Sequence, residues 1–193
     1  MYGPETRRNL WPRWIDHENE TERVPIARRP EDIAILVTGG AGYLGSVLCE
    51  RLLAAGCRVT TVDNMMYQQQ SLLHLCANPD FDFVPGDVRD EGLMGRLVKQ
   101  ADVLIPLAAI VGAPACDRDP LLSRSVNLEA IGLLNRLRSR HQLVVYPTTN
   151  SGYGTQSGNL FCTEDTPLEP ISLTAGQKPR LRQSYCRRLT LLL

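Results

Sequence analysis

The sequence predicts an α/β fold built on a doubly wound parallel sheet, and three observations support this prediction. Five short apolar runs rich in Val, Ile and Leu have the near-continuous hydrophobicity of strands that are buried on both faces of a sheet. Stretches of helical length separate them, which favours alternating strands and helices. A glycine-rich turn joins the first run to the first helical stretch. The runs are IAILVTG, RVTTVD, FDFVPGD, DVLIPLAA and LVVYPTT, beginning at residues 33, 58, 81, 102 and 143.

Helices are expected in the stretches between these runs, at about 43–55, 69–77, 90–100 and 120–140. The last stretch shows the helical period most clearly, because five apolar residues can share one buried stripe: Leu122, Val126, Ile131, Leu134 and Leu137. Right-handed crossovers between parallel strands then give a Rossmann-type doubly wound parallel sheet. The prediction is a sheet truncated after the fifth strand.

Composition narrows the class of protein. A hydrophobic content of 43%, a charged content of 22% and a net charge of zero fit a soluble globular domain with no overall field that would recruit nucleic acid or a membrane. No apolar run approaches the roughly 20 residues of a membrane span. The six cysteines form neither a C-x-x-C pair nor a Cys/His cluster, so we expect no metal site and a reducing, cytoplasmic location.

Three segments are expected along the chain. Residues 1–31 hold both tryptophans and mixed charges without a sustained period, which predicts a flexible N-terminal extension. Residues 32–173 carry the alternating strand and helix pattern of a partial Rossmann-type domain. Residues 174–193 contain five basic residues and no acidic one, an abrupt change that we interpret as an aberrant basic tail.

The turn LVTGGAGYLG, residues 36–45, is typical of a phosphate-binding loop. Gly39 suits the sharp turn out of the strand, Gly42 suits close approach of a pyrophosphate, and Gly45 suits tight packing of helix on strand. The amides of Tyr43 and Leu44 would then face the phosphates from the start of the helix. A glycine triplet alone is weak evidence, since structural turns also use glycine.

A carboxylate at the end of the second run strengthens the interpretation. Asp63 lies 18 residues beyond Gly45, where it can accept both hydroxyls of the adenosine ribose and would repel a 2′-phosphate. Asn64, directly after it, is counted with the same site. The pattern therefore favours NAD over NADP as the cofactor, and the alternative is a surface aspartate beside a structural turn.

With these residues in place, T-G-G-A-G-Y-L-G resembles the fingerprint of the extended short-chain dehydrogenase/reductases, and within them the NAD-dependent epimerase/dehydratase family that acts on nucleotide sugars. The resemblance covers about residues 33–173. Further motifs match in order, namely Gly86-Asp87-Val88, Leu107-Ala108-Ala109 and Asn127 in S-V-N-L. The resemblance implies that Asp87 and Val88 contact the adenine. It also implies that the small side chains of Leu107-Ala108-Ala109, after the fourth strand, let the dinucleotide lie across the strand ends. It also places Asn127 beside the active site.

The resemblance implies a catalytic set of which only part is present. Thr149 matches the family's catalytic hydroxyl, and Lys178 has the spacing of the family lysine that lowers the pKa of a catalytic tyrosine. Thr174 stands where that tyrosine, the general base, is expected. Because an aliphatic hydroxyl is too weak an acid for this role, we expect no turnover from the chain as written.

Two explanations of residues 174–193 stay open. The first is a frameshift: loss of one thymine nucleotide between the codons for Leu173 and Thr174 would account for the basic tail, because restoring that nucleotide permits a Y-x-x-x-K motif. The second is a genuinely diverged C-terminus. Three functions are weighed accordingly: the cofactor-binding part of a nucleotide-sugar epimerase or dehydratase that transiently oxidises sugar C4, a catalytically silent NAD-binding module, and an unfolded product. The resemblance also implies a nucleotide-sugar substrate. It leaves open whether the chain forms a homodimer, which sugar is bound, and whether the reaction is epimerisation or dehydration.

Overall fold

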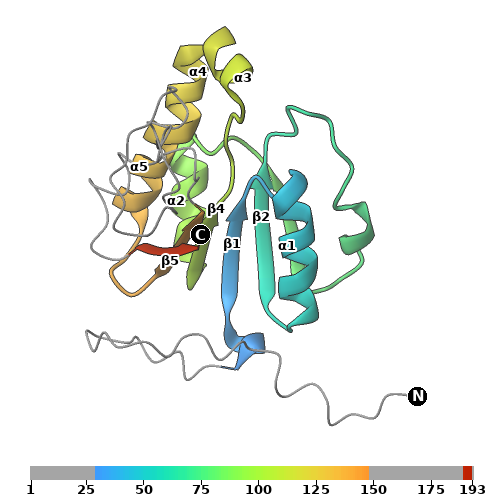
Figure 1. Cartoon of the computed structure of the whole chain (residues 1–193). Helices are drawn as coiled ribbons and strands as arrows, with labels where there is room; N and C mark the ends of the chain where they lie inside the picture. The colour runs from blue at the N-terminus through green and yellow to red at the C-terminus, as the bar shows by residue number, and fades with distance from the viewer. Residues whose placement is uncertain (1–28, 148–188, 193) are drawn as a thin grey trace, which may run out of the picture.

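The computed structural model describes residues 29–147 and 189–192, which form a six-stranded parallel sheet flanked by helices (Figure 1). The strand order is β3-β2-β1-β4-β5-β6. The chain therefore reverses its direction of travel across the sheet between β1 and β4, which is the switch point of a doubly wound fold. The strands are β1 (Ala34–Thr38), β2 (Arg58–Asp63), β3 (Phe81–Pro85), β4 (Val103–Pro106), β5 (Leu143–Pro147) and β6 (Leu189–Leu192).

The five predicted strands are confirmed, and a sixth is added. β6 lies within the segment expected to be an aberrant tail, and it pairs in parallel with β5, with Leu189 opposite Val144. This strand was not predicted, because the short apolar run that forms it follows a segment dominated by basic residues, 174–188.

The helices agree with the prediction except in two places. They are α1 (Tyr43–Ala54), α2 (Glu91–Lys99), α3 (Ala113–Arg118), α4 (Pro120–Arg124), the π-helical turn η4 (Ser125–Glu129) and α5 (Ala130–Leu137), with 3-10 turns η2 (Pro30–Asp32) and η3 (Leu73–Leu75). The predicted helix at 69–77 is wrong, since only η3 forms there. The segment is bounded by Gln68, which has a positive φ of 51°, and by Asn78 before Pro79, which disfavours helical geometry, so little room is left for a longer helix. Helix α3 was not predicted.

Two hydrophobic layers enclose the sheet, as alternation along buried strands requires. Val37 and Val59 belong to the cluster that includes Cys49 and Leu53 of α1. Neighbouring strand residues turn to the other face, where the cluster comprises Leu36, Val62, Met94, Leu97, Val98, Leu104, Leu134 and Val144. The sheet is thus covered by α1 on one side and by α2 and α5 on the other.

The five apolar residues of the stripe predicted for residues 120–140 are buried or partly buried, as expected, but they do not pack into a single cluster. Val126, Ile131 and Leu134 are buried, and Leu122 and Leu137 are partly buried. They contribute to three separate clusters, because the helix is interrupted by η4 and runs from the cavity region to the sheet.

Within the described residues, no helix is both long and apolar enough to cross a membrane. Over the same part of the chain, no three His, Cys, Asp or Glu side chains are grouped so that they could hold a metal ion.

Candidate functional site

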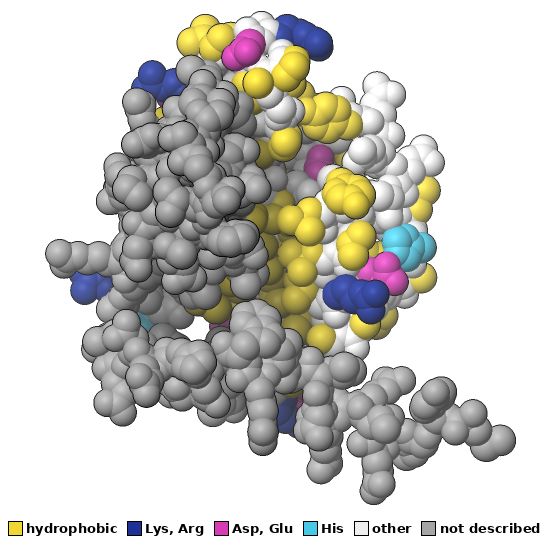
Figure 2. Space-filling model, in the orientation of Figure 1, with side chains coloured by type: hydrophobic (Ala, Val, Ile, Leu, Met, Phe, Trp, Pro, Cys, Tyr) yellow, Lys and Arg dark blue, Asp and Glu magenta, His cyan; other side chains and the backbone are white. Residues whose placement is uncertain are grey.

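A cavity of about 810 Å³ opens at the carboxyl ends of the strands around the switch point. Its walls are the loops that follow β1, β2, β3 and β4, together with part of α4 and η4. Figure 2, in the orientation of Figure 1, shows a band of hydrophobic side chains running down the middle of the described surface. Every predicted cofactor residue except Asn127 lines the cavity: Gly39, Gly42, Tyr43, Leu44, Gly45, Asp63, Asn64, Asp87, Val88, Leu107, Ala108 and Ala109.

The glycines of the first loop meet real geometric requirements. Gly39 has a φ of 72°, and a Cβ atom there would lie 2.6 Å from the backbone nitrogen of Ala108. A Cβ atom on Gly45 would lie 2.6 Å from Gly40 Cα, so only glycine lets the first turn of α1 pack against the loop. The loop therefore needs glycine at the turn and at the packing position that the sequence indicated.

The start of α1 is suited to an anion. Gly42 is its N-cap and supplies no side-chain cap, and no acidic residue lies in the first turn. The first amides of a helix have no intrahelical acceptor, and the helix dipole adds positive potential there. Tyr43, Leu44 and Gly45 supply these amides and all line the cavity. Phosphate groups are the natural ligands of such a helix start.

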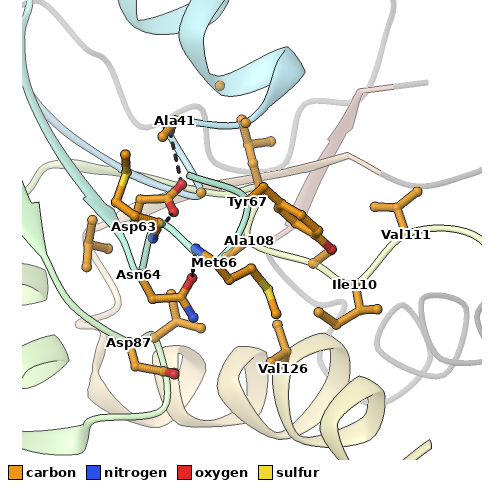
Figure 3. Close-up of a pocket in the computed structure, with 18 of the residues that line it drawn as sticks. Ala41, Asp63, Asn64, Met66, Tyr67, Asp87, Ala108, Ile110, Val111 and Val126 are labelled. Carbon is orange, nitrogen blue, oxygen red and sulfur yellow. Dashed lines mark hydrogen bonds between the residues drawn. The ribbon is translucent and has the colours of Figure 1, made fainter. Parts of the chain in front are cut away.

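Asp63 joins two of the cavity's loops (Figure 3). Its Oδ2 accepts a hydrogen bond from the Ala41 amide at 3.0 Å, and its Oδ1 accepts one from the Met65 amide at 2.8 Å. Each carboxylate oxygen keeps a second lone pair that can accept another donor. The side chain can therefore still meet ribose hydroxyls, while it also fixes the phosphate loop, a role that the sequence analysis did not foresee.

The loop after β2 presents two side chains that the sequence analysis missed. Met65 and Gln68 both have positive φ angles, 56° and 51°, and the Gln68 amide donates to the Met65 carbonyl at 2.8 Å. The Asn64 side chain accepts from the Met66 amide at 3.1 Å. This turn sets Met66 and Tyr67 on the cavity wall, where they add apolar and aromatic surface (Figure 3).

Asp87 is held by an arginine that was also missed. Arg89 Nε donates to Asp87 Oδ1 at 2.8 Å, and Arg89 Nη2 donates to Oδ2 at 2.6 Å. These side-chain hydrogen bonds are the main reason that the pKa of Asp87 falls to about 2. The carboxylate is thus an ionised acceptor with a fixed orientation. Arg89 also donates to Ser125 Oγ at 3.2 Å, which ties the segment after β3 to the long helix.

Asn127 lies behind the cavity wall and not on it. The side chain is 3% exposed; its Oδ1 accepts from the Ile110 amide at 2.8 Å, and its Nδ2 donates to the Ile110 carbonyl at 3.0 Å. It therefore positions the loop that carries Leu107, Ala108 and Ala109. The π-helical turn that contains Asn127 is of a kind that often occurs at functional sites.

The predicted catalytic residues Thr149 and Lys178, and Thr174 between them, lie outside the described residues. Pro147, at the end of β5, lines the cavity.

The fold and the cavity define a dinucleotide-binding domain, because a glycine-rich loop, an uncapped helix start and a strand-end carboxylate meet at the switch point of a parallel sheet. The model of the NAD dependent epimerase/dehydratase family matches residues 35–178. The chain therefore belongs to this family, as its motifs predicted.

Individual relatives agree with the family. A UDP-glucose 4-epimerase of Mycolicibacterium smegmatis is 34% identical over 148 residues, which are 74% of this chain and 47% of the relative. A UDP-N-acetyl-alpha-D-glucosaminuronate decarboxylase of Bacillus cytotoxicus is 32% identical over 151 residues, 78% of this chain and 44% of the relative. The chain thus spans about half the length of the curated relatives it matches.

Among solved structures, the dTDP-glucose 4,6-dehydratase DesIV of Streptomyces venezuelae, with NAD and TYD bound, superposes with a TM-score of 0.73 and 27% identity. The match covers 82% of this chain and 54% of that one. The doubly wound fold is therefore shared with a relative whose structure contains NAD.

Proposed function

We propose that the cavity binds NAD and that the chain carries the cofactor-binding part of a nucleotide-sugar epimerase or dehydratase. The pyrophosphate would lie at the start of α1, near the Tyr43 and Leu44 amides. The adenosine ribose would meet Asp63 and Asn64, and the adenine would meet Asp87 and Val88. The observation that carries the proposal is that an uncapped helix start and a fixed carboxylate share one cavity at the switch point.

The charges in the cavity favour NAD. Asp63 and Asp87 both line the cavity, and the pKa of Asp87 is held low by Arg89. A 2′-phosphate on the ribose would bring a further negative charge close to Asp63. Among the described residues that line the cavity, Arg89 carries the cationic side chain, but its guanidinium already donates two hydrogen bonds to Asp87. The site therefore offers poor compensation for the extra phosphate.

Replacing Asp63 with alanine tests the cofactor assignment. The unmodified chain should bind NAD at least about tenfold more tightly than NADP, as like-charge repulsion in a partly buried site predicts. Asp63→Ala should reduce that ratio severalfold, although both affinities will also fall because the Ala41 and Met65 amides lose their acceptor. Asp63→Asn is the matched control, since it removes the charge but retains a side-chain oxygen. Calorimetric titration that gives tighter NADP binding by the unmodified chain would sink the assignment.

Bound NAD, held by the cavity residues named above, would supply the reversible hydride-transfer chemistry for a transient oxidation at C4 of the sugar. Thr149 would hydrogen-bond the reacting oxygen. Lys178 has the spacing of the family lysine that acts through a catalytic tyrosine, but Thr174 occupies that tyrosine's position in this chain. The substrate would be a nucleotide sugar. Members of the family often pair as homodimers, and the scattered cysteines favour a reducing cytoplasm. Epimerisation and dehydration both fit this scheme.

Thr174 favours a second candidate, a catalytically silent NAD-binding module. A threonine hydroxyl cannot act as the proton acceptor that the scheme requires at this position. Assay of nucleotide-sugar turnover tests this candidate: the chain as written should show none, and interconversion of sugars when NAD is bound would contradict a silent module.

A further inference from the structure

The peptide group between Ala41 and Gly42, in the phosphate loop, is held at both of its polar atoms. The Ala41 carbonyl accepts a hydrogen bond from Ser71 Oγ at 2.7 Å. The Gly42 amide donates to the Gly39 carbonyl at 3.2 Å. The preceding peptide is held as well, since the Ala41 amide donates to Asp63. Ala41 itself is 4% exposed, so this part of the loop is fixed from inside the molecule.

The direction of the Ala41 carbonyl matters for an anion. This carbonyl immediately precedes the helix start whose amides face the cavity. A carbonyl oxygen carries partial negative charge, so an oxygen turned toward the cavity would repel a phosphate group, whereas the helix amides attract it. The Ser71 hydroxyl donates to this oxygen at 2.7 Å, and because Ser71 is not among the residues that line the cavity, the bond holds the oxygen toward a group off the cavity wall.

Ser71 reaches the phosphate loop from a distant part of the sequence, at the end of the loop that follows β2. Met65, at the start of that loop, is joined to Ala41 through Asp63, and Ser71 closes the other end directly on Ala41. The next residue, Leu72, is buried in the core and anchors this end. Ser71 is half-buried and does not line the cavity, so it can influence a ligand only through the loop.

We propose that Ser71 is a positioning residue for the pyrophosphate of the dinucleotide, which it serves by keeping the Ala41 carbonyl turned away from the anion. This inference rests on the proposed function of the cavity. Loss of the hydroxyl should weaken ligands that carry a pyrophosphate by about 3–10-fold, the effect of one net hydrogen bond. Ligands without phosphate should bind with unchanged affinity, since the adenosine contacts do not depend on the orientation of this peptide.

The test compares adenosine with ADP on the full 193-residue chain. Dissociation constants are measured by calorimetry for ADP and by NMR titration for adenosine, with the unmodified chain, Ser71→Ala and Ser71→Thr. Ser46→Ala is the matched control, because Ser46 Oγ also donates to a carbonyl near the helix start, that of Tyr43 at 3.2 Å, and lies off the cavity wall. Thermal unfolding of each variant verifies that it is folded.

We expect Ser71→Ala to lose about 3–10-fold in ADP affinity and less than about twofold in adenosine affinity. Ser71→Thr should bind ADP as the unmodified chain does, and Ser46→Ala should bind both ligands with unchanged affinity. Unchanged ADP affinity in Ser71→Ala would overturn the inference, as would equal losses for ADP and adenosine. Failure of the unmodified chain to bind either ligand would instead count against the proposed function itself.

Discussion

Replacing Gly45 with alanine should abolish detectable NAD binding and lower the free energy of unfolding by about 1–3 kcal/mol. The added methyl would contact the Gly39 carbonyl oxygen and lie 2.6 Å from Gly40 Cα. Both neighbours are backbone atoms of the phosphate loop, so the clash can be relieved only if α1 and the loop move apart. That movement would displace the Tyr43 and Leu44 amides from the cavity.

Gly95→Ala is the matched control for this variant. Gly95 lies within α2, where a Cβ atom would meet Leu137 Cδ2 at 3.8 Å, an ordinary contact. Alanine is favoured over glycine inside a helix, so this change should be neutral or stabilise by up to about 1 kcal/mol. Calorimetry with NAD and urea denaturation measure both variants. If Gly45→Ala binds NAD as the unmodified chain does, the phosphates do not lie at this helix start.

Asn127→Ala should lower the free energy of unfolding by about 1–3 kcal/mol, because it leaves the buried Ile110 amide without its acceptor. Ile110 lies in the loop that follows β4, so this loop should also become more mobile and NAD affinity should fall with stability. Urea denaturation measures the first effect, and hydrogen exchange of the Ile110 amide measures the second.

Asn135→Ala, in the adjoining helix α5, is the control, since within the described residues Asn135 Oδ1 accepts a local hydrogen bond, from Arg138 Nε at 2.6 Å. Changes outside buried networks are usually within about 0.5 kcal/mol. Equal stability of the two variants, with the Ile110 amide still protected in Asn127→Ala, would show that Asn127 does not hold the loop.

The fold and the main outline of the cavity could be predicted from sequence because both depend on local patterns. Buried parallel strands appear as apolar runs, and the turn into α1 requires glycine at Gly39 and Gly45 for steric reasons that any similar turn shares. Asp63 could be found because its distance from the glycine loop is set by the length of one helix and one strand.

The missed features depend on contacts between distant segments. Ser71 and Ala41 are 30 residues apart, and Asn127 and Ile110 are 17 residues apart. A serine or an asparagine in a polar stretch gives no sign of which backbone group it will meet. Arg89 lies only two residues after Asp87, so an interaction between them was conceivable from the sequence. The spacing of an arginine and an aspartate in a turn does not, however, show that they form a bidentate pair.

Titration of NAD into the isotopically labelled chain, followed through backbone amide chemical shifts, tests the NAD site most directly. Binding at the proposed site should shift the amides of Tyr43, Leu44 and Gly45 at the start of α1, together with that of Val88 after β3. Addition of ADP should reproduce these shifts, since they arise from the adenosine and pyrophosphate half. The absence of shifts at millimolar NAD, or shifts confined to residues remote from the cavity, would contradict the assignment of this cavity as an NAD site.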